Sequence, residues 1–320
     1  MCAEGPPPGR GGARGGRAEG RVRVDVLLVE RGLARSRTEA QGLVIEGRVR
    51  VDGRPVAKPG LKVEPGAGLE LEPPSRRYVS RGGLKLEKAL DFFGLDVTGL
   101  DCLDVGASTG GFTDCLLRRG ARRVYAVDVG YGLLAWSLQT DPRVVVLDRT
   151  NARHLEPESF RRAAEARLAG RPADGDREFR WPTFATCDVS FISLLKVFPA
   201  VATVLREPWQ AVLLVKPQFE AGRELVGPRG VVRDPEVHVD VLEAVAGGLA
   251  RLGWPARGLT YSPIRGPEGN LEYLLLLARG PVAAGPGLHG TREEAAAGAV
   301  TRVLVERVVA DAFAALAGKS

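Results

Sequence analysis

Asp101-Cys-Leu-Asp-Val-Gly-Ala-Ser-Thr-Gly-Gly-Phe112 is the stretch that decides the fold of this chain, because an apolar strand runs directly into a glycine-rich turn that opens a helix. Glycine allows unusual backbone dihedrals and close approach to a ligand, and the N–H groups at a helix N-terminus face that ligand. The next strand, residues 123–128, ends in a carboxylate placed to accept hydrogen bonds from ribose hydroxyls. The pattern is typical of a nucleotide-cofactor loop.

Two acids, Asp104 and Asp128, end these strands, and paired carboxylates would suit a cationic ligand. The spacing Asp-x-Gly-x-x-x-Gly-Gly differs from the Gly-x-Gly-x-x-Gly of nicotinamide and flavin dinucleotide sites. It therefore favours S-adenosylmethionine, whose sulfonium is positive. A glycine turn with no ligand is the alternative, and the paired acids argue against it. The predicted cofactor-binding residues are Asp104, Gly106, Ser108, Thr109, Gly110, Gly111, Phe112 and Asp128.

The composition of the 320 residues is that of a soluble globular protein, with 44% hydrophobic and 26% charged residues. No apolar run reaches the length of a membrane span and the N-terminus lacks the apolar stretch of a secretion signal, so we expect a cytoplasmic protein. The cysteines lie far apart, without metal-ligand spacing, at Cys2, Cys102, Cys115 and Cys187. This scatter predicts reduced thiols and no bound metal.

Positive charge is concentrated in the N-terminal quarter of the chain. Residues 1–80 contain 15 Lys and Arg against 10 Asp and Glu, whereas the whole chain has a net charge of +6. Lys and Arg release counterions from phosphates, so the excess favours a polyanionic partner, with a solvated basic surface as the alternative. Residues 1–20 are rich in Gly and Arg and are expected to be disordered.

A small α+β module is predicted over residues 21–73. A helix at residues 24–31 precedes a second one that starts at the capping box Ser36-Arg-Thr-Glu39 and runs to residue 46. A hairpin that turns at Asp52-Gly53 follows. These segments resemble the αL-type RNA-binding module of ribosomal proteins, pseudouridine synthases and tyrosyl-tRNA synthetases. The resemblance implies, against a merely solvated charged face, that RNA is bound by Arg35, Arg37, Arg48 and Arg50.

Residues 74–280 are predicted to form a doubly wound, Rossmann-like α/β sheet. Strand candidates alternate with helices beyond the cofactor loop, at residues 144–147, 184–188, 211–216 and 272–277. Ligands bind beyond the carboxyl ends of such strands, and the polar groups that fall there are Asp104, Asp128, Asp188 and Lys216. Residues 156–181 read as a surface insertion. Residues 281–320 read as a linker, centred on 285–290, and a packed closing helix over 293–316.

Four charged residues follow in the order Lys, Asp, Lys, Glu. They are Lys85, Asp188 in Cys-Asp-Val-Ser-Phe-Ile-Ser-Leu194, Lys216 in Leu-Val-Lys-Pro-Gln-Phe-Glu220, and Glu272 in Gly-Asn-Leu-Glu-Tyr273. With the cofactor loop, they make residues 22–280 resemble the TlyA family, in which an FtsJ-type methyltransferase domain follows an αL module. The resemblance implies 2′-O-methylation of cytidine in ribosomal RNA with S-adenosylmethionine, and this tetrad as the catalytic set. It implies ribosomal RNA or ribosomal subunits as partners. Because no apolar run reaches spanning length, we expect no membrane partner, and we infer no obligate protein partner.

The chemistry of methyl transfer to a hydroxyl also supports the tetrad, independently of the family resemblance. A ribose hydroxyl is a poor nucleophile, so a base that withdraws its proton helps methyl transfer. Lys216 is the candidate base, but an ordinary lysine has a pKa of about 10.4 and is protonated at neutral pH. Lys85, the ligand's sulfonium and removal from water would each lower the pKa of Lys216. Asp188 and Glu272 act in the opposite sense and are assigned to orienting the lysines and the hydroxyl.

Other interpretations are less favoured. Nitrogen methylation of bases commonly uses an Asn/Asp-Pro-Pro-aromatic turn, where this chain has Asp188-Val-Ser-Phe191. Carbon methylation would use the thiolate of Cys187, but nothing nearby clearly lowers a thiol pKa. A catalytically silent RNA-binding or assembly factor stays open, and the intact tetrad argues against it. A hemolysin-like membrane-active protein also stays open, although no strongly amphipathic apolar segment supports it.

Overall fold

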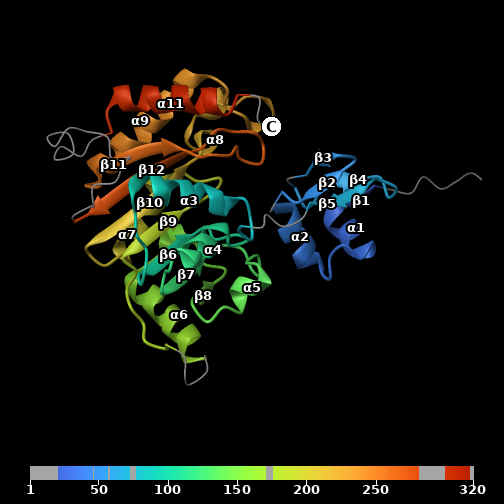
Figure 1. Ribbon diagram of the computed structural model, residues 1–320, viewed down its shortest axis with the longest axis horizontal. Coiled ribbons are helices and arrows are strands. Elements are labelled where there is room, and N and C mark those ends of the chain that lie inside the picture. The colour runs from blue at the N-terminus through green and yellow to red at the C-terminus, as the bar shows by residue number, and fades with distance from the viewer. Residues whose placement is uncertain are drawn as a thin grey trace, which may run out of the picture.

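The computed structural model describes residues 21–45, 47–56, 58–72, 77–170, 176–280 and 300–317. The predicted disordered tail over residues 1–20 and the predicted linker over residues 285–290 lie outside this range. A small N-terminal module and a larger α/β domain make up the described chain (Figure 1).

The N-terminal module has two helices and two small sheets. Its elements are β1 (Val22–Arg23), α1 (Val24–Glu30), α2 (Arg37–Ile45), β2 (Val49–Val51), β3 (Arg54–Pro55), β4 (Lys62–Val63) and β5 (Leu69–Leu71). Strand β1 pairs with β4, and the second sheet has the order β3-β2-β5. Apolar side chains from both helices and from β2 form one core, which includes Val24, Leu28, Ala40, Val44 and Val49.

Local sequence signals in this module are confirmed. The N–H of Glu39 donates to Ser36 Oγ at 3.1 Å, so Ser36 caps α2 as predicted, and the Glu39 carboxylate accepts the N–H of Arg35, one residue before the cap, at 2.6 Å. Asp52 and Gly53 both adopt left-handed φ angles, of 49° and 73°, at the predicted hairpin turn. Tight hairpin turns require this conformation, which explains the Asp-Gly dipeptide.

The larger domain is built on a seven-stranded sheet with the order β11-β12-β10-β9-β6-β7-β8. Its strands are β6 (Asp101–Val105), β7 (Arg123–Val127), β8 (Val144–Leu147), β9 (Phe184–Cys187), β10 (Trp209–Val215), β11 (Ala256–Tyr261) and β12 (Tyr273–Arg279). The central strands are parallel, and β12 is antiparallel to both of its neighbours. The chain runs outward from β6 to β8 and then returns to β9, on the other side of β6. This reversal of strand order creates the crevice in which doubly wound sheets bind ligands.

Helices cover both faces of the sheet (Figure 1). They are α3 (Gly82–Phe93), α4 (Gly111–Arg118), α5 (Trp136–Gln139), α6 (Pro157–Ala169), α7 (Leu194–Thr203), α8 (Pro217–Glu220), α9 (Pro235–Arg251) and α11 (Arg302–Ala315), with 3-10 turns at Ala152–His154, Arg223–Leu225 and Pro228–Gly230. Buried side chains of α3, α4 and α5 form one core layer, and those of α6, α7, α9 and α11 form the other. The predicted doubly wound α/β sheet is confirmed.

The expectation that residues 156–181 form a surface insertion is wrong. Helix α6 is amphipathic and buries Phe160, Ala164 and Leu168 against the sheet. It is therefore the crossover helix between β8 and β9, as the wound topology requires. Its high content of Arg and Ala reflects the solvent-facing side of the helix, which concealed the buried residues that recur every four positions.

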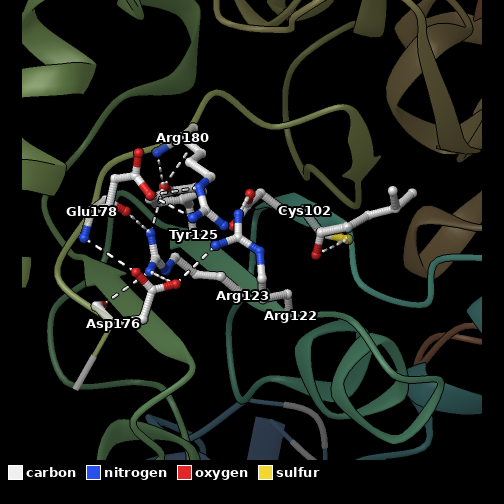
Figure 2. A network of polar contacts seen from close by, with 9 residues as sticks. Cys102, Arg122, Arg123, Tyr125, Asp176, Glu178 and Arg180 are labelled. Atoms are coloured by element: carbon white, nitrogen blue, oxygen red, sulfur yellow. Dashed lines mark hydrogen bonds and ion pairs between the residues drawn. The ribbon is translucent and has the colours of Figure 1, made fainter. Parts of the chain in front are cut away.

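The segment after α6 is also fixed to the sheet, through a buried arginine (Figure 2). Arg123, whose side chain is 2% exposed, donates to the carbonyl oxygens of Asp176 and Glu178 and pairs with the Asp176 carboxylate at 2.8 Å. Tyr125 donates its hydroxyl to the carbonyl of Arg180 at 2.8 Å. A buried guanidinium must be paired in this way, because an uncompensated buried charge is strongly unfavourable.

Helix α11 lies within the range expected for a packed C-terminal helix, and residues 293–299 of that range lie outside the described residues. It buries Val305, Val308, Val309 and Ala312 in the same core layer as α9. One strand of the seven-stranded sheet, β11, was not expected. Its residues mix Arg, Gly and Thr with apolar side chains, so neither a continuous apolar run nor a clean alternation marks it.

Candidate active site

A cavity of about 410 Å³ lies at the carboxyl ends of the central strands. Its volume falls in the range of small-molecule and cofactor sites. The cavity wall contains most of the predicted cofactor loop and all of the predicted tetrad: Lys85, Gly106, Ser108, Thr109, Gly111, Phe112, Asp188, Lys216 and Glu272. The structure thus brings together residues that are far apart in the sequence, on α3, the β6–α4 loop and the ends of β9, β10 and β12.

Two glycines shape the loop between β6 and α4. Gly106 has a φ of 79°, and a Cβ there would lie 2.4 Å from the carbonyl oxygen of Asp188. Gly110, the N-cap of α4, has a φ of 97°, and a Cβ there would lie 2.3 Å from the side chain of Leu138. Both positions therefore exclude side chains by backbone conformation and by contact. The loop can pass close to β9 and leave its own backbone exposed to the cavity.

Asp128 lies just behind this loop, at the end of β7. Its carboxylate accepts the N–H of Ser108 at 2.8 Å and the N–H of Gly130 at 2.7 Å. Each carboxylate oxygen has two lone pairs, so these bonds leave acceptor capacity for a ligand hydroxyl. Asp128 does not line the cavity directly, and its observed contacts fix the shape of the loop that does.

The structure contradicts the prediction that Asp104 presents its charge to the cofactor. Its side chain is fully buried within β6 and does not line the cavity. It accepts hydrogen bonds from the hydroxyls of Thr113 at 2.6 Å and Thr186 at 2.8 Å. Burial raises the pKa of Asp104 to about 6, and the two hydroxyl bonds only partly offset that rise. The contacts tie α4 and β9 to β6, so Asp104 organises the loop from below and does not present charge to a ligand.

Strand direction explains how the tetrad assembles. Asp188 follows β9 and Lys216 follows β10, so both emerge at the carboxyl edge of parallel strands. Glu272 precedes β12, and because β12 is antiparallel, its beginning lies at that same edge. The register pairs Val215 with Tyr273, which places Lys216 and Glu272 beside each other. Lys85 reaches the group from the first turns of α3.

The four residues form two close ion pairs. Lys85 Nζ lies 2.5 Å from Glu272 Oε2, and Lys216 Nζ lies 2.6 Å from Asp188 Oδ1. Burial disfavours the ammonium of Lys85, but the charges of Glu272 and Asp188 outweigh it and hold its pKa above the ordinary value. Burial likewise opposes ionisation of Asp188, yet Lys216 and Lys85 lower its pKa. Lys85 is therefore a fixed cation at neutral pH.

Sequence reasoning missed several side chains in the cavity wall, and three of them, Ser190, Phe191 and Phe219, lie close to the tetrad in the sequence. Ser190 accepts a hydrogen bond from Lys216 Nζ at 3.0 Å. Phe191, which is 89% exposed, packs its ring against Phe219 with the centroids 4.8 Å apart. All three lie within four residues of a predicted tetrad member, but a loop serine or phenylalanine has no periodicity that would distinguish it. Their role depends on the fold of the loops that carry them.

The four predicted RNA-binding arginines stand at two places in the N-terminal module. Arg35 and Arg37 flank the start of α2, where helix N–H groups attract phosphate. Arg37 also lies 3.1 Å from the buried Asp25 carboxylate. Arg48 donates to the carbonyl of Glu72 at 3.1 Å, and Arg50 pairs with the Glu72 carboxylate at 2.6 Å. These pairs leave a module with exposed guanidinium groups on α2 and beside β2.

Two other properties concern metals and membranes. In the part of the chain that the structure describes, no three His, Cys, Asp or Glu side chains gather closely enough to hold a metal ion. Among the described helices, none has the length and apolarity needed to cross a bilayer.

The sheet, the glycine-rich loop and the charged tetrad define a methyltransferase of the Rossmann-like class. A family model described as FtsJ-like methyltransferase matches residues 78–279, and an S4 domain model matches residues 22–69. The chain belongs to the FtsJ-like methyltransferase family and carries an S4 domain at its N-terminal side.

Named relatives extend over both domains. The chain is 49% identical to the 16S/23S rRNA (cytidine-2′-O)-methyltransferase TlyA of Mycobacterium tuberculosis, over 80% of this chain and 90% of the relative. It is 38% identical to Hemolysin A of Brachyspira hyodysenteriae, over 79% of this chain and 98% of the relative. A solved structure described as a hemolysin from Streptococcus thermophilus superposes with a TM-score of 0.64 at 40% identity, over 93% of this chain and 98% of that one.

Proposed function

We propose that this protein transfers a methyl group from S-adenosylmethionine to the ribose 2′-hydroxyl of cytidine in ribosomal RNA. The observation that carries the proposal is the pairing of Lys85 with Glu272 and of Lys216 with Asp188 in the wall of the cavity that the glycine-rich loop lines. The name of the M. tuberculosis relative, at 49% identity, supports the same reaction and the same nucleoside. The expected place of action is the cytoplasm, where ribosomal RNA is found.

The residues around the loop fit S-adenosylmethionine. A Cβ at Gly106 would collide with the carbonyl oxygen of Asp188, so glycine at this position lets the loop backbone pass close to the end of β9. Asp128 stands at the end of β7, where such sheets bind ribose hydroxyls, and the start of α4, at Gly111 and Phe112, lines the cavity. Ser108, Thr109 and Phe112 supply polar and apolar contacts in the cavity wall.

The tetrad can handle the proton of the ribose hydroxyl. S-adenosylmethionine, when bound, supplies a methyl group on a sulfonium whose sulfur keeps the electron pair of the broken bond. Lys216, in its neutral form, accepts the hydroxyl proton at Nζ and later releases it to water, while Asp188 and Ser190 hold that nitrogen in place. Lys85 stays protonated and stabilises the negative charge that develops on the ribose oxygen, and Glu272 fixes its position.

An aromatic pair, in which the Phe191 ring is exposed, supports a nucleic acid substrate with an unstacked base. Phe191 and Phe219 present ring surface at the cavity that contains Lys216. Bases that have left a helix are commonly stacked on such rings. The S4 domain and its arginines then provide a second contact with the RNA, so we propose that residues 21–73 capture RNA and residues 74–280 carry out the chemistry.

Transfer of labelled methyl from S-adenosylmethionine to ribosomal RNA, followed by mapping of ribose methyls, tests the proposal. Lys216→Ala should lower the single-turnover rate by about 10² to 10⁴, because general-base assistance contributes that much. Lys216→Arg should not restore it, because a guanidinium stays protonated. Lys196→Ala, which changes an exposed lysine of α7, is the matched control and should be silent. A near-normal rate for Lys216→Arg would refute the base assignment.

Two other candidates are tested by the same preparation. A silent assembly factor would bind ribosomal RNA without turning over the cofactor, and the intact tetrad argues against it. The name of the B. hyodysenteriae relative raises membrane lysis. Leakage of dye from lipid vesicles at protein concentrations that saturate methyl transfer would support that activity in addition to catalysis.

A further inference from the structure

A second cavity, of about 580 Å³, adjoins the active site and has no role in the proposed reaction. It lies between the 3-10 turn Pro228–Gly230, the loop before β12 and the C-terminal helix α11. Three of its lining residues, Arg265, Pro267 and Glu268, also line the active-site cavity. The two cavities are therefore neighbours that share these three residues in their walls.

The rim of this cavity is cationic. Arg229, Arg233 and Arg265 line it, against the single carboxylate of Glu268. Among the described residues, Arg229 and Arg233 form no ion pair, and both side chains are exposed. Arg229 also has a φ of 68°, a left-handed conformation that is unfavourable for a residue with a side chain. Guanidinium groups arranged in this way are suited to phosphate, which they bind with two parallel hydrogen bonds.

The floor of the cavity is apolar and partly supplied by α11. Leu271, Val232 and the ring of Phe313 line it, and the Phe313 ring packs on His238 with the centroids 5.1 Å apart. Arg265 connects the floor to the wall, because its guanidinium donates to the carbonyls of Gly269 at 2.8 Å and Leu316 at 2.9 Å. A cationic rim above an aromatic floor matches the chemistry of a nucleotide, with phosphate outside and base or ribose inside.

We infer that this arginine cavity, lined by Arg229, Arg233, Arg265, Leu271 and Phe313, binds a nucleotide of the RNA strand next to the one that is methylated. The inference rests on the proposed function and gives it a second contact close to the chemistry. Arg229 and Arg233 contact the phosphate, and Phe313 supports the base or sugar. Helix α11 thereby has a function, because without Phe313 the floor of the cavity would be incomplete.

The test compares two double variants of the full-length protein. Arg229→Gln with Arg233→Gln removes the rim charges, and Arg251→Gln with Arg307→Gln removes two exposed charges on α9 and α11 as the matched control. The rim pair should weaken binding to ribosomal RNA about tenfold at physiological salt and flatten the log–log salt dependence by about 1.4, from two single-strand phosphate contacts. The control pair should change neither, and S-adenosylmethionine affinity should be equal in all proteins. Equal effects of the two pairs would overturn the inference.

Two further measurements separate the alternatives. In the wild-type protein, bound ribosomal RNA should protect Arg229 and Arg233 from an arginine-modifying reagent but leave Arg251 and Arg307 reactive, and failure to protect would overturn the inference without any variant. Cytidine monophosphate is the second probe: if the rim variant loses its binding but keeps full RNA affinity, the cavity is a free-nucleotide site and the inference is wrong. If wild-type protein transfers no methyl yet its RNA affinity still depends on the rim pair, the proposed function fails and the RNA contact stands.

Discussion

The buried pair of Lys85 and Glu272 offers the sharpest test of the site's electrostatics. The Lys85 side chain is 9% exposed and that of Glu272 is 1% exposed, so each charge is poorly solvated if its partner is removed. Lys85→Met should leave Glu272 as an uncompensated buried anion, and Glu272→Leu should leave Lys85 as a buried cation. The double variant removes both charges and leaves neither problem.

The expected magnitudes follow from this burial. Breaking a buried pair by removing one partner costs about 3 to 5 kcal/mol, whereas replacing both by apolar residues is often neutral or stabilising. We expect Glu272→Leu at the lower end, because the charge of Asp188 also supports the ammonium of Lys85. A loss of about 3 kcal/mol lowers the melting temperature of a domain of this size by about 6 to 12 °C. The double variant should lie within about 1 kcal/mol of wild type.

The assay is urea unfolding of the wild type, the two single variants and the double variant at pH 7. The folded-state pKa of Lys85 is raised, so its stabilising contribution is complete below the unfolded pKa and is lost only as pH rises through the higher folded value. Neutral pH therefore measures the full effect. Arg279→Gln is the control, because its 2.7 Å pair with Glu207 is half exposed on both sides and should be worth less than about 1 kcal/mol.

The stability of the double variant decides whether the charges of Lys85 and Glu272 are energetically coupled. If its loss of stability equals the sum of the two single losses, the ions are not coupled and the site is more hydrated than the structure shows. All three variants should lose methyl transfer whatever their stability, since the proposed chemistry needs both Lys85 and the Glu272 carboxylate that fixes its position. A double variant that is as stable as wild type but inactive would separate the structural role of the pair from its catalytic role.

Three further predictions concern the other acids and the RNA module. Asp128→Ala should weaken S-adenosylmethionine binding by about 1 to 3 kcal/mol in calorimetry, and an unchanged affinity would exclude Asp128 from the cofactor site. Burial raises the pKa of Asp104 from 3.8 to about 6. The free energy of unfolding of the wild type should therefore fall by about 3 kcal/mol relative to that of Asp104→Asn as pH rises through this interval, in denaturation measured at several pH values. Parallel pH profiles of the two proteins would contradict this prediction. Removing residues 1–72 should preserve cofactor binding but abolish methylation of ribosomal RNA. The double variant Arg35→Ala with Arg37→Ala should reproduce part of the loss, and the log–log slope of its RNA affinity against salt should flatten by about 0.7 to 0.9 per lost contact. A truncated enzyme of full rate would show that the module does not anchor the substrate.

Local patterns in the sequence were sufficient for the elements with strong signals. The capping box at Ser36 and Glu39, the Asp52-Gly53 turn and the strand-loop-helix at residues 101–112 each depend on contacts within a few residues, so their geometry can be predicted from neighbours alone. The misread helix α6 shows the limit of composition, because its many Arg and Ala residues concealed a narrow apolar stripe that becomes evident only against the sheet.

The composition and meaning of the site depended on contacts between distant residues. Sequence order placed Asp104 and Asp128 at strand ends alike, but the alternation of side chains along β6 turned Asp104 inward to Thr113 and Thr186. The four members of the tetrad could be named from their family pattern, whereas their pairing could not. Lys85 meets Glu272 only because β12 enters the sheet antiparallel beside β10, and strand order and direction are set by the packing of the whole sheet.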